Sequence, residues 1–273
     1  MAHTLQDRYS PLVDAKLRAS LVTKDGVIFN NRYEGNPKAG AVKIPVRDTE
    51  ATVAAYSKTD GVSLTVGSTS YLTLTIDKDY AVNELIDGFD AASVPDNLVA
   101  DRLDSAGYSL ALQIDKDGIA ELESGGTAFG TTTALTKSTI YETFVDIRTA
   151  LSNANIPAER RFALVSPAVF ALVLKSPEFI SASNLGDTVK QTGAQGRIAG
   201  FNVYESNNLA ATTEIIAGHP DWCTRVNEWA VAVHLQDLSG SGKFIGASSV
   251  QGRKIYAHKV TKAAAVQIKT VAS

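Results

Sequence analysis

The segment from Arg161 to Leu209 carries the clearest succession of local signals in the chain. Residues 162–165, FALV, form a short apolar run bounded by a turn signal, which predicts a buried strand. Ser166 can cap a helix, and Pro167 suits its first turn because proline has no N–H to lose there. A polar, glycine-bearing loop leads to residues 201–205, where apolar and polar residues alternate as in a half-buried strand. The segment therefore predicts a strand, a helix, a long loop and a second strand.

The chain has 273 residues and a formal net charge of −3, with 44% hydrophobic residues. This length fits one large domain or two of ordinary size, and the composition supports a packed core. The charge argues against a dedicated nucleic-acid binder, which needs an excess of Lys and Arg, but it suits a container that must release nucleic acid. No apolar run approaches the roughly 20 residues of a membrane span, and the first residues lack a signal-peptide core, so synthesis in the cytoplasm is the expectation.

Residues 1–38 have mixed polarity, and a short amphipathic helix is expected around Asp14–Leu21. We interpret this part as an extended arm that needs another surface to lie on, with a poorly ordered terminus as the alternative.

Residues 41–76 alternate apolar and polar on both sides of a turn signal at Asp60-Gly61, which predicts a long β-hairpin. A lone hairpin is marginal in water, so it must lie on a partner or on the rest of the chain. The alternative is an edge hairpin of the subunit's own sheet.

Two helices are expected next. Residues 80–89 place Val82, Leu85, Ile86 and Phe89 at helical spacing. A longer helix should begin at the Ser93–Asp96 start signal and end at Gly125-Gly126. Its apolar stripe recurs at intervals of three or four residues: Val99, Leu103, Ala106, Leu110 and Ile114. Two glycines, Gly107 and Gly118, weaken this helix, and two acidic residues, Asp115 and Asp117, are assigned to its solvated face.

The second half of the chain begins after a Gly/Thr linker at 125–133, the expected domain boundary. A capping-box pattern at Thr139–Glu142 predicts a helix with one buried face, formed by Ile140, Phe144, Ile147 and Leu151. Residues 214–218 read as a buried strand, and residues 222–235 have mostly helical spacing. Residues 253–260 and 263–268 are expected to form two closing strands.

No motif in the sequence predicts a catalytic, cofactor-binding or metal-binding residue. Gly240–Lys243 lacks the other positions of a phosphate loop, and a calcium loop at Asp115 lacks its first and last ligands. The four histidines, His3, His219, His234 and His258, do not have zinc-site spacing. His219-Pro220-Asp221 is expected to be a turn in which Asp221 caps a following helix. Cys223, the single cysteine, excludes an internal disulfide and is expected to be a small buried hydrophobe.

The order of these pieces resembles the tailed-bacteriophage major capsid proteins, the HK97-like fold family. The residues that carry the resemblance are RFALVSP at 161–167 and GRIAGFNVYESNNL at 196–209, together with the hairpin and long helix before them. The resemblance implies an α+β HK97-like capsid fold with four parts. These are an N-terminal arm (1–40), a long E-loop hairpin (41–76), a peripheral domain with a spine helix (77–130 and 236–273) and an inserted axial domain (131–235).

The resemblance also implies a function. The chain is expected to be a structural, non-enzymatic major capsid protein that self-assembles as hexamers and pentamers into an icosahedral shell around double-stranded DNA, and to reside in the virion. Its expected partners are copies of itself, a portal and decoration proteins, without cofactor, metal or membrane. Residues 1–38 are too short for a built-in scaffolding segment, so a separate scaffolding protein or none is expected. Some family members cross-link Lys to Asn, but nothing selects Lys43, Lys58 or Lys78 for that chemistry.

Three alternatives stay open at this point. The Arg161–Leu209 unit also fits a generic α/β unit of another soluble protein. An encapsulin-like compartment would share the fold and hold a cargo enzyme in place of DNA. An α+β hydrolase or transferase with an unrecognised acidic site is the alternative from a different functional class.

Overall fold

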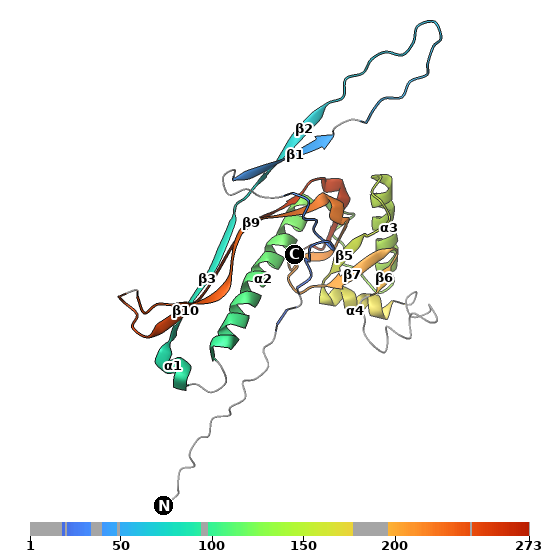
Figure 1. Ribbon diagram of the computed structural model, residues 1–273. Helices are drawn as coiled ribbons and strands as arrows, with labels where there is room; N and C mark the ends of the chain where they lie inside the picture. The colour runs from blue at the N-terminus through green and yellow to red at the C-terminus, as the bar shows by residue number, and fades with distance from the viewer. Residues whose placement is uncertain are drawn as a thin grey trace, which may run out of the picture.

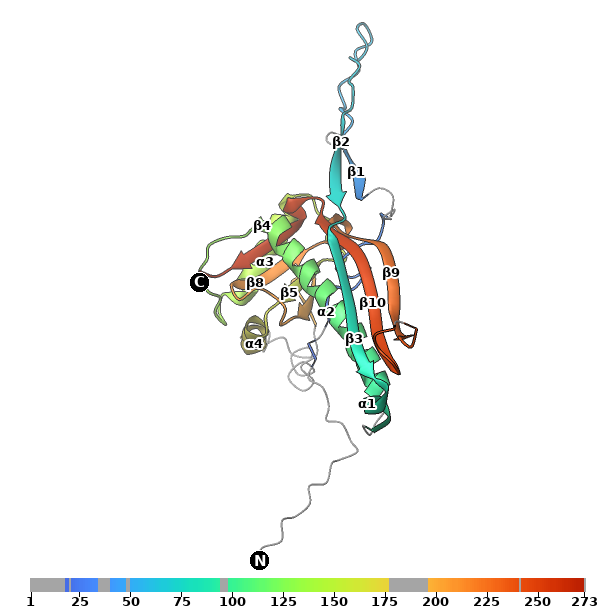
Figure 2. The ribbon, with the colours of Figure 1, turned by 90° about the vertical axis from the view of Figure 1, so that its left-hand side faces the viewer.

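The computed structural model describes residues 18–19, 21–33, 40–47, 50–93, 98–176, 196–240 and 242–272. In these residues the strands form a six-stranded sheet, a three-stranded sheet and a separate two-stranded hairpin. Figures 1 and 2 show the hairpin pointing away from the body of the molecule, at the end opposite to the short helix α1 (Gly88–Ser93). None of the helices in the described residues combines the length and apolar content needed to cross a bilayer.

The central strands of the six-stranded sheet are buried on both faces. Its strands in spatial order are β4 (Thr127–Ala128), β11 (Val266–Thr270), β8 (Thr213–Gly218), β5 (Phe162–Val165), β7 (Phe201–Glu205) and β6 (Arg197–Ile198). The expected strands at 162–165 and 201–205 are confirmed and pair in parallel. The strand at 214–218 is confirmed as β8, antiparallel to β5. Residues 162–165 are all buried, because the two faces of β5 contact different layers.

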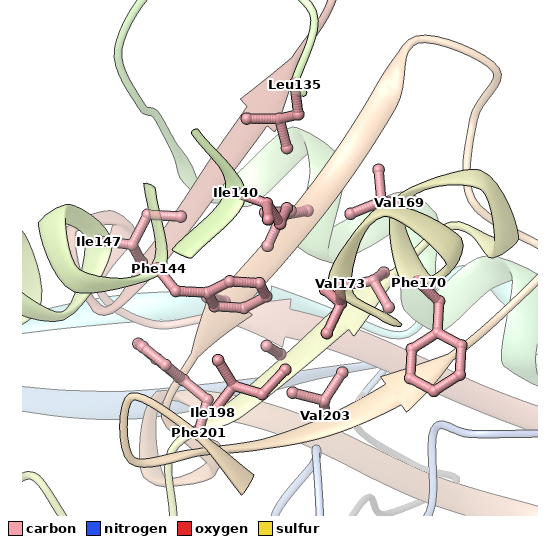
Figure 3. Close-up of a cluster of buried hydrophobic side chains, with 14 of the residues drawn as sticks. Leu135, Ile140, Phe144, Ile147, Val169, Phe170, Val173, Ile198, Phe201 and Val203 are labelled. Carbon is pink, nitrogen blue, oxygen red and sulfur yellow. The ribbon is translucent and has the colours of Figure 1, made fainter. Parts of the chain in front are cut away.

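Two helices cover one face of this sheet. Helix α4 (Pro167–Lys175) begins as expected, with the Val169 N–H donating to Ser166 Oγ at 3.3 Å. Helix α3 (Ile140–Asn153) buries the expected stripe from Ile140 to Leu151. Figure 3 shows side chains of both helices meeting those of β6 and β7. The prediction of a capping box is wrong. The Thr139 side chain does not cap α3, because its Oγ1 accepts instead from the Thr136 N–H in the preceding turn.

The three-stranded sheet has the order β3 (Lys78–Asp87), β10 (Ala247–Val260) and β9 (Cys223–Asp237), all antiparallel. The predicted helices at 80–89 and 222–235 are therefore wrong. In β3, Val82 and Ile86 lie four residues apart, which satisfies strand and helix periods alike. Strand β9 carries two register irregularities against β10, and the extra residues interrupt its alternation and imitate helical spacing.

Three strands lie in a different sheet from the one that the expected domain boundaries would give. Strand β4 lies in the six-stranded sheet although it falls within 77–130. Strand β9 lies in the three-stranded sheet although most of it falls within 131–235. Strand β11 lies inside the six-stranded sheet, between β4 and β8, although it falls within 236–273. The chain therefore passes between the two sheets more often than the sequence indicated.

The long helix α2 (Leu98–Gly125) is confirmed, and it ends at the expected glycine. It packs along the three-stranded sheet through Ala106, and its C-terminal half reaches the second face of the six-stranded sheet through Ile119 and Leu122. The assignment of Asp115 and Asp117 to a solvated face is wrong. Asp115 is buried, and Asp117 is half-buried, where it accepts the Tyr256 hydroxyl at 2.7 Å.

Residues 21–33 pack against their own chain through the buried positions 22–23 and 28–30, and do not form a free arm. Ile28 and Phe29 are fully buried between α2 and the six-stranded sheet. Asn30 fixes the segment to the start of β9, because its side-chain amide donates to three backbone carbonyls, including that of Cys223 at 2.9 Å. This part of the expected N-terminal arm is therefore a core element. The helix expected around Asp14–Leu21 lies almost entirely outside the described residues.

Candidate assembly surfaces

The hairpin is anchored to the body through its stem. Strands β1 (Ala41–Arg47) and β2 (Thr69–Thr75) pair antiparallel over seven positions. Ile44 and Leu74 are buried against Val226 and Ala257 of the three-stranded sheet. The stem is thus a separate two-stranded layer on that sheet, and not one of its edge strands.

Beyond the stem the hairpin continues as an extended loop over residues 50–68 (Figures 1 and 2). The expected turn is present, with the Ser57 hydroxyl oxygen accepting the N–H groups of Thr59 and Asp60. Gly61 has a φ of +69°, a left-handed conformation that glycine adopts without strain. The alternating residues 62–66 are not in a strand, so the regular ladder is shorter than expected.

Apolar side chains of this distal loop are open to solvent. Val53, Leu64 and Val66 are 94%, 100% and 97% exposed, and Tyr56 is also mostly exposed. Burying a side chain of this size gains about 1.5–3 kcal/mol. Since the described residues leave these side chains uncovered, the distal loop is the first candidate contact surface for another molecule.

A second apolar surface lies at the opposite end of the molecule. Phe89 in α1 is 79% exposed, and Ile245 in the β9–β10 connection is 90% exposed. Their neighbours Gly88 and Gly246 approach so closely that a Cβ on Gly88 would clash with the Gly246 carbonyl. Helix α1 and this connection therefore present a joint apolar tip.

The phosphate-loop-like stretch, the His219-Pro220-Asp221 turn and Cys223 are parts of the fold and do not form a catalytic site. Residues 239–240 and 242–243 lie in the connection between β9 and β10. His219 Nδ1 accepts the Asp221 N–H at 3.2 Å within a 3₁₀ turn, and a strand follows in place of the helix that Asp221 was expected to cap. The Asp221 carboxylate instead accepts from Arg32 at 2.6 Å.

Cys223 is confirmed as a buried small residue, and burial raises the pKa of its thiol, which makes the thiol inert.

The remaining histidines do not form a site together. His234 lies on β9, where its Nδ1 contacts the Ala232 carbonyl, and His258 is buried on β10. His3 lies outside the described residues. Across the part of the chain that the structure describes, no three His, Cys, Asp or Glu side chains are placed to hold a metal ion.

A buried polar cluster was missed by the sequence reasoning. Arg225 of β9 donates to His258 Nε2 at 2.9 Å, to Asp25 at 3.0 Å and to the Thr23 carbonyl at 2.7 Å, and its guanidinium lies over the Phe29 ring. Burial lowers the pKa of Arg225. Burial, together with Arg225, lowers the pKa of His258 to about 3, so the imidazole is neutral. The cluster fastens residues 23–29 to the three-stranded sheet.

One signal could have located the cluster's neighbour Asp115. The apolar stripe of α2 continues past Ile114 to Ile119 and Leu122, so its buried face includes position 115. A charged residue at a buried helical position needs partners, and their identity depends on the tertiary fold. Arg225, in contrast, lies in a stretch that resembled a helix, and nothing local marked it.

A family model described as "Phage capsid protein" matches residues 89–240, more than half of the chain. The chain belongs to this phage capsid protein family. Membership identifies a structural protein of a phage capsid, located in the virion shell, and not an enzyme. It does not favour the generic α/β unit, the encapsulin-like compartment or the hydrolase. No curated protein sequence matches the chain.

Solved capsid structures share the fold over nearly the whole length. A structure described as Mycobacterium phage Che8 superposes with a TM-score of 0.80 at 21% identity, covering 97% of this chain and 96% of that chain. The capsid of cyanophage P-SCSP1u gives 0.78 at 12% identity, covering 98% and 93%. The capsid of a native GTA particle gives 0.72 at 15% identity, covering 98% and 96%. The α+β, HK97-like capsid fold expected from the sequence is thus confirmed.

Proposed function

We propose that this phage capsid protein assembles through its hairpin, as hexamers and pentamers, into a closed icosahedral shell. The observation that carries the proposal is the distal loop at 50–68, which projects from the body (Figure 1) and whose large apolar side chains are exposed. A neighbouring copy supplies the missing apolar surface. Each contact can be modest, because every subunit in a closed shell makes several contacts at once.

The division into domains is also proposed, with boundaries adjusted to the sheets. The peripheral domain comprises β3, α1, α2, β9 and β10, and the axial domain comprises β4 to β8, α3, α4 and β11. Residues 21–33 belong to the junction between the two domains, because they contact α2 and both sheets. The hairpin forms the E-loop.

The proposed content of the shell is double-stranded DNA, held without sequence-specific binding. The net charge of −3 supports this, since a strongly basic lining would retain DNA by neutralising its phosphates. A portal, decoration proteins and a separate scaffolding protein are the proposed further partners. Synthesis in the host cytoplasm precedes assembly.

The test is to compare three purified chains by mass photometry and negative-stain microscopy. One variant replaces residues 48–68 with Asn-Gly, a two-residue turn that closes the ladder where Arg47 pairs with Thr69. The other, Val53→Ser with Leu64→Ser and Val66→Ser, keeps the loop length. We expect shells or discrete capsomers from the wild type and folded, unassembled subunits from both variants. Shells of normal size from the shortened chain would overturn the role of the hairpin.

A further inference from the structure

The first part of the chain that the structure describes lies along the long helix α2 before it enters the core. Three residues of this N-terminal segment contact three residues of the helix. These contacts join Thr23 to Asp115, Ala19 to Tyr108 and Arg18 to Asp104. A later residue of the segment always contacts a later residue of the helix, so the two run in the same direction.

The spacing of these contacts requires an extended backbone. From Asp104 to Asp115 the helix rises by about 16 Å. The five residue steps from Arg18 to Thr23 cover about 16 Å only when the chain is extended. In agreement, no described residue between Arg18 and Thr23 is helical, although a helix was expected around Asp14–Leu21.

The charges on both sides favour a continuation of this path toward the start of α2. Asp101 lies three residues before Asp104, on the same face of the helix. The hydrogen bond to Asp104, with an added contribution from Asp101, raises the pKa of Arg18. Side chains on one side of an extended chain recur at every second residue, so an extended continuation places Lys16 on the side of Arg18. The segment therefore offers a second cation where the helix offers a second carboxylate.

We propose that residues 15–17 continue along α2 of their own chain, with the Lys16 ammonium paired to the Asp101 carboxylate. From Asp104 back to its first residue, the helix measures about 9 Å, which three extended residues span. The same chain is favoured over a second copy, because Arg18 is bound two residues away and holds Lys16 near the carboxylate.

This contact goes beyond the proposed function, because it forms within an isolated subunit and needs no neighbour. It gives the N-terminal segment a docking surface on α2 that extends from Thr23 back to Ala15. Only the residues before Ala15 are then left to reach another subunit.

A disulfide tests the contact in the full-length chain. The pair Lys16→Cys and Asp101→Cys places two thiols at the proposed contact, and the single natural cysteine, Cys223, is buried. The matched control combines Lys16→Cys with Arg102→Cys, one position along the helix and turned by about 100° around its axis. The Arg102 guanidinium lies 3.3 Å from the Glu84 carboxylate of β3, on the side of the three-stranded sheet. A disulfide requires Cα atoms within about 7 Å of each other.

We expect mild oxidation of dilute subunits to form the intrachain disulfide of the test pair about tenfold faster than that of the control pair. Peptide mass spectrometry without reduction identifies which thiols are joined. Equal rates for the two pairs would overturn the proposal. Covalent dimers in place of the intrachain bond would show that a second copy covers this face of α2, and this would overturn the proposal as well.

A charge exchange provides a second measurement if a cysteine pair unfolds in thermal melts. We expect Asp101→Lys to speed tryptic cleavage after Arg18 by about threefold, because like charges push Lys16 away from the helix. Adding Lys16→Glu to this variant should restore the slower rate. An unchanged rate with Asp101→Lys, or no recovery in the double variant, would contradict the proposed pair.

Discussion

Asn208, in the connection between β7 and β8, donates its side-chain amide to Asp115 of α2 at 2.7 Å. The other Asp115 oxygen accepts from the N–H groups of Val22 and Thr23 and from the Thr23 hydroxyl, at 2.8–2.9 Å. One carboxylate thus joins the N-terminal segment, the long helix and the six-stranded sheet. Its hydrogen bonds offset the unfavourable burial of its charge.

Removal of this carboxylate should destabilise the subunit strongly. We expect Asp115→Ala to lower the free energy of unfolding by about 3 kcal/mol or more, because several buried donors lose their acceptor. Asn208→Ala should lower it by about 1 kcal/mol. The exchange Asp115→Asn with Asn208→Asp keeps an amide–carboxylate pair and should recover part of the loss. Urea denaturation measures each variant, and a loss below about 0.5 kcal/mol for Asp115→Ala would contradict the role of this junction.

Replacing each of the two interior glycines of α2 by alanine should change the stability of the subunit in opposite directions. A Cβ at Gly118 would lie 3.0 Å from Cε2 of the fully buried Phe29 ring, whereas nothing lies within 4 Å of a Cβ at Gly107. We therefore expect Gly107→Ala to stabilise the subunit by up to about 1 kcal/mol through helix propensity. Gly118→Ala should destabilise it by about 1–2 kcal/mol through overpacking. Thermal denaturation distinguishes the two, and stabilisation by both would show that Phe29 can move aside.

Stability should fall in mild acid because of His258. Burial, Arg225, Lys254 and Lys78 lower its pKa to about 3 in the folded chain, from an ordinary 6.5. Below pH 6.5 the unfolded chain therefore binds a proton that the folded chain does not bind, and the free energy of unfolding drops by about 1.4 kcal/mol per pH unit.

The control for this pH effect is His258→Gln, whose side-chain oxygen can still accept from Arg225. We expect the free energy of unfolding, measured between pH 7 and pH 5, to fall more steeply for the wild type than for this variant. The difference in slope should approach that of one extra proton bound by the unfolded chain. Parallel profiles would show that His258 is protonated in the folded chain, contrary to its buried position.

Cys223 should report on global unfolding. Its side chain is fully buried, and burial raises the pKa of its thiol, so no thiolate is available in the folded chain. We expect negligible labelling by a thiol reagent under native conditions and stoichiometric labelling in denaturant. The labelling rate at intermediate urea should follow the unfolding curve, and rapid native labelling would indicate local opening at the start of β9.

Elements with complete local signals could be predicted from the sequence. The Ser166-Pro167 start of α4 and the stripe of α3 depend on neighbours within a few residues, and both are present. Strands β3 and β9 could not be assigned, because their structure is determined by pairing with β10. The irregularities in β9 also removed the alternation that marks a strand.

The surfaces were predictable only in part. The alternation over 41–76 located the hairpin, but the extent of its ladder depends on where the body supports the stem, at Val226 and Ala257. The junction at Asp115 could not be predicted, because its donors at Val22 and Asn208 lie about 90 residues away on either side. Long-range polar contacts of this kind leave no periodic trace in a sequence.

Strand β11 lies inside the six-stranded sheet although it is among the last residues to be synthesised, and this delays completion of the sheet. A chain that lacks residues 266–270 cannot complete the six-stranded sheet, because β8 has no partner on that side and β4 has none at all. Pairing of such distant segments is slow, since the loop must close before the contact is gained. A nascent subunit therefore carries an open sheet edge on the ribosome, and a complete six-stranded sheet becomes available to neighbouring subunits only after these late residues have emerged.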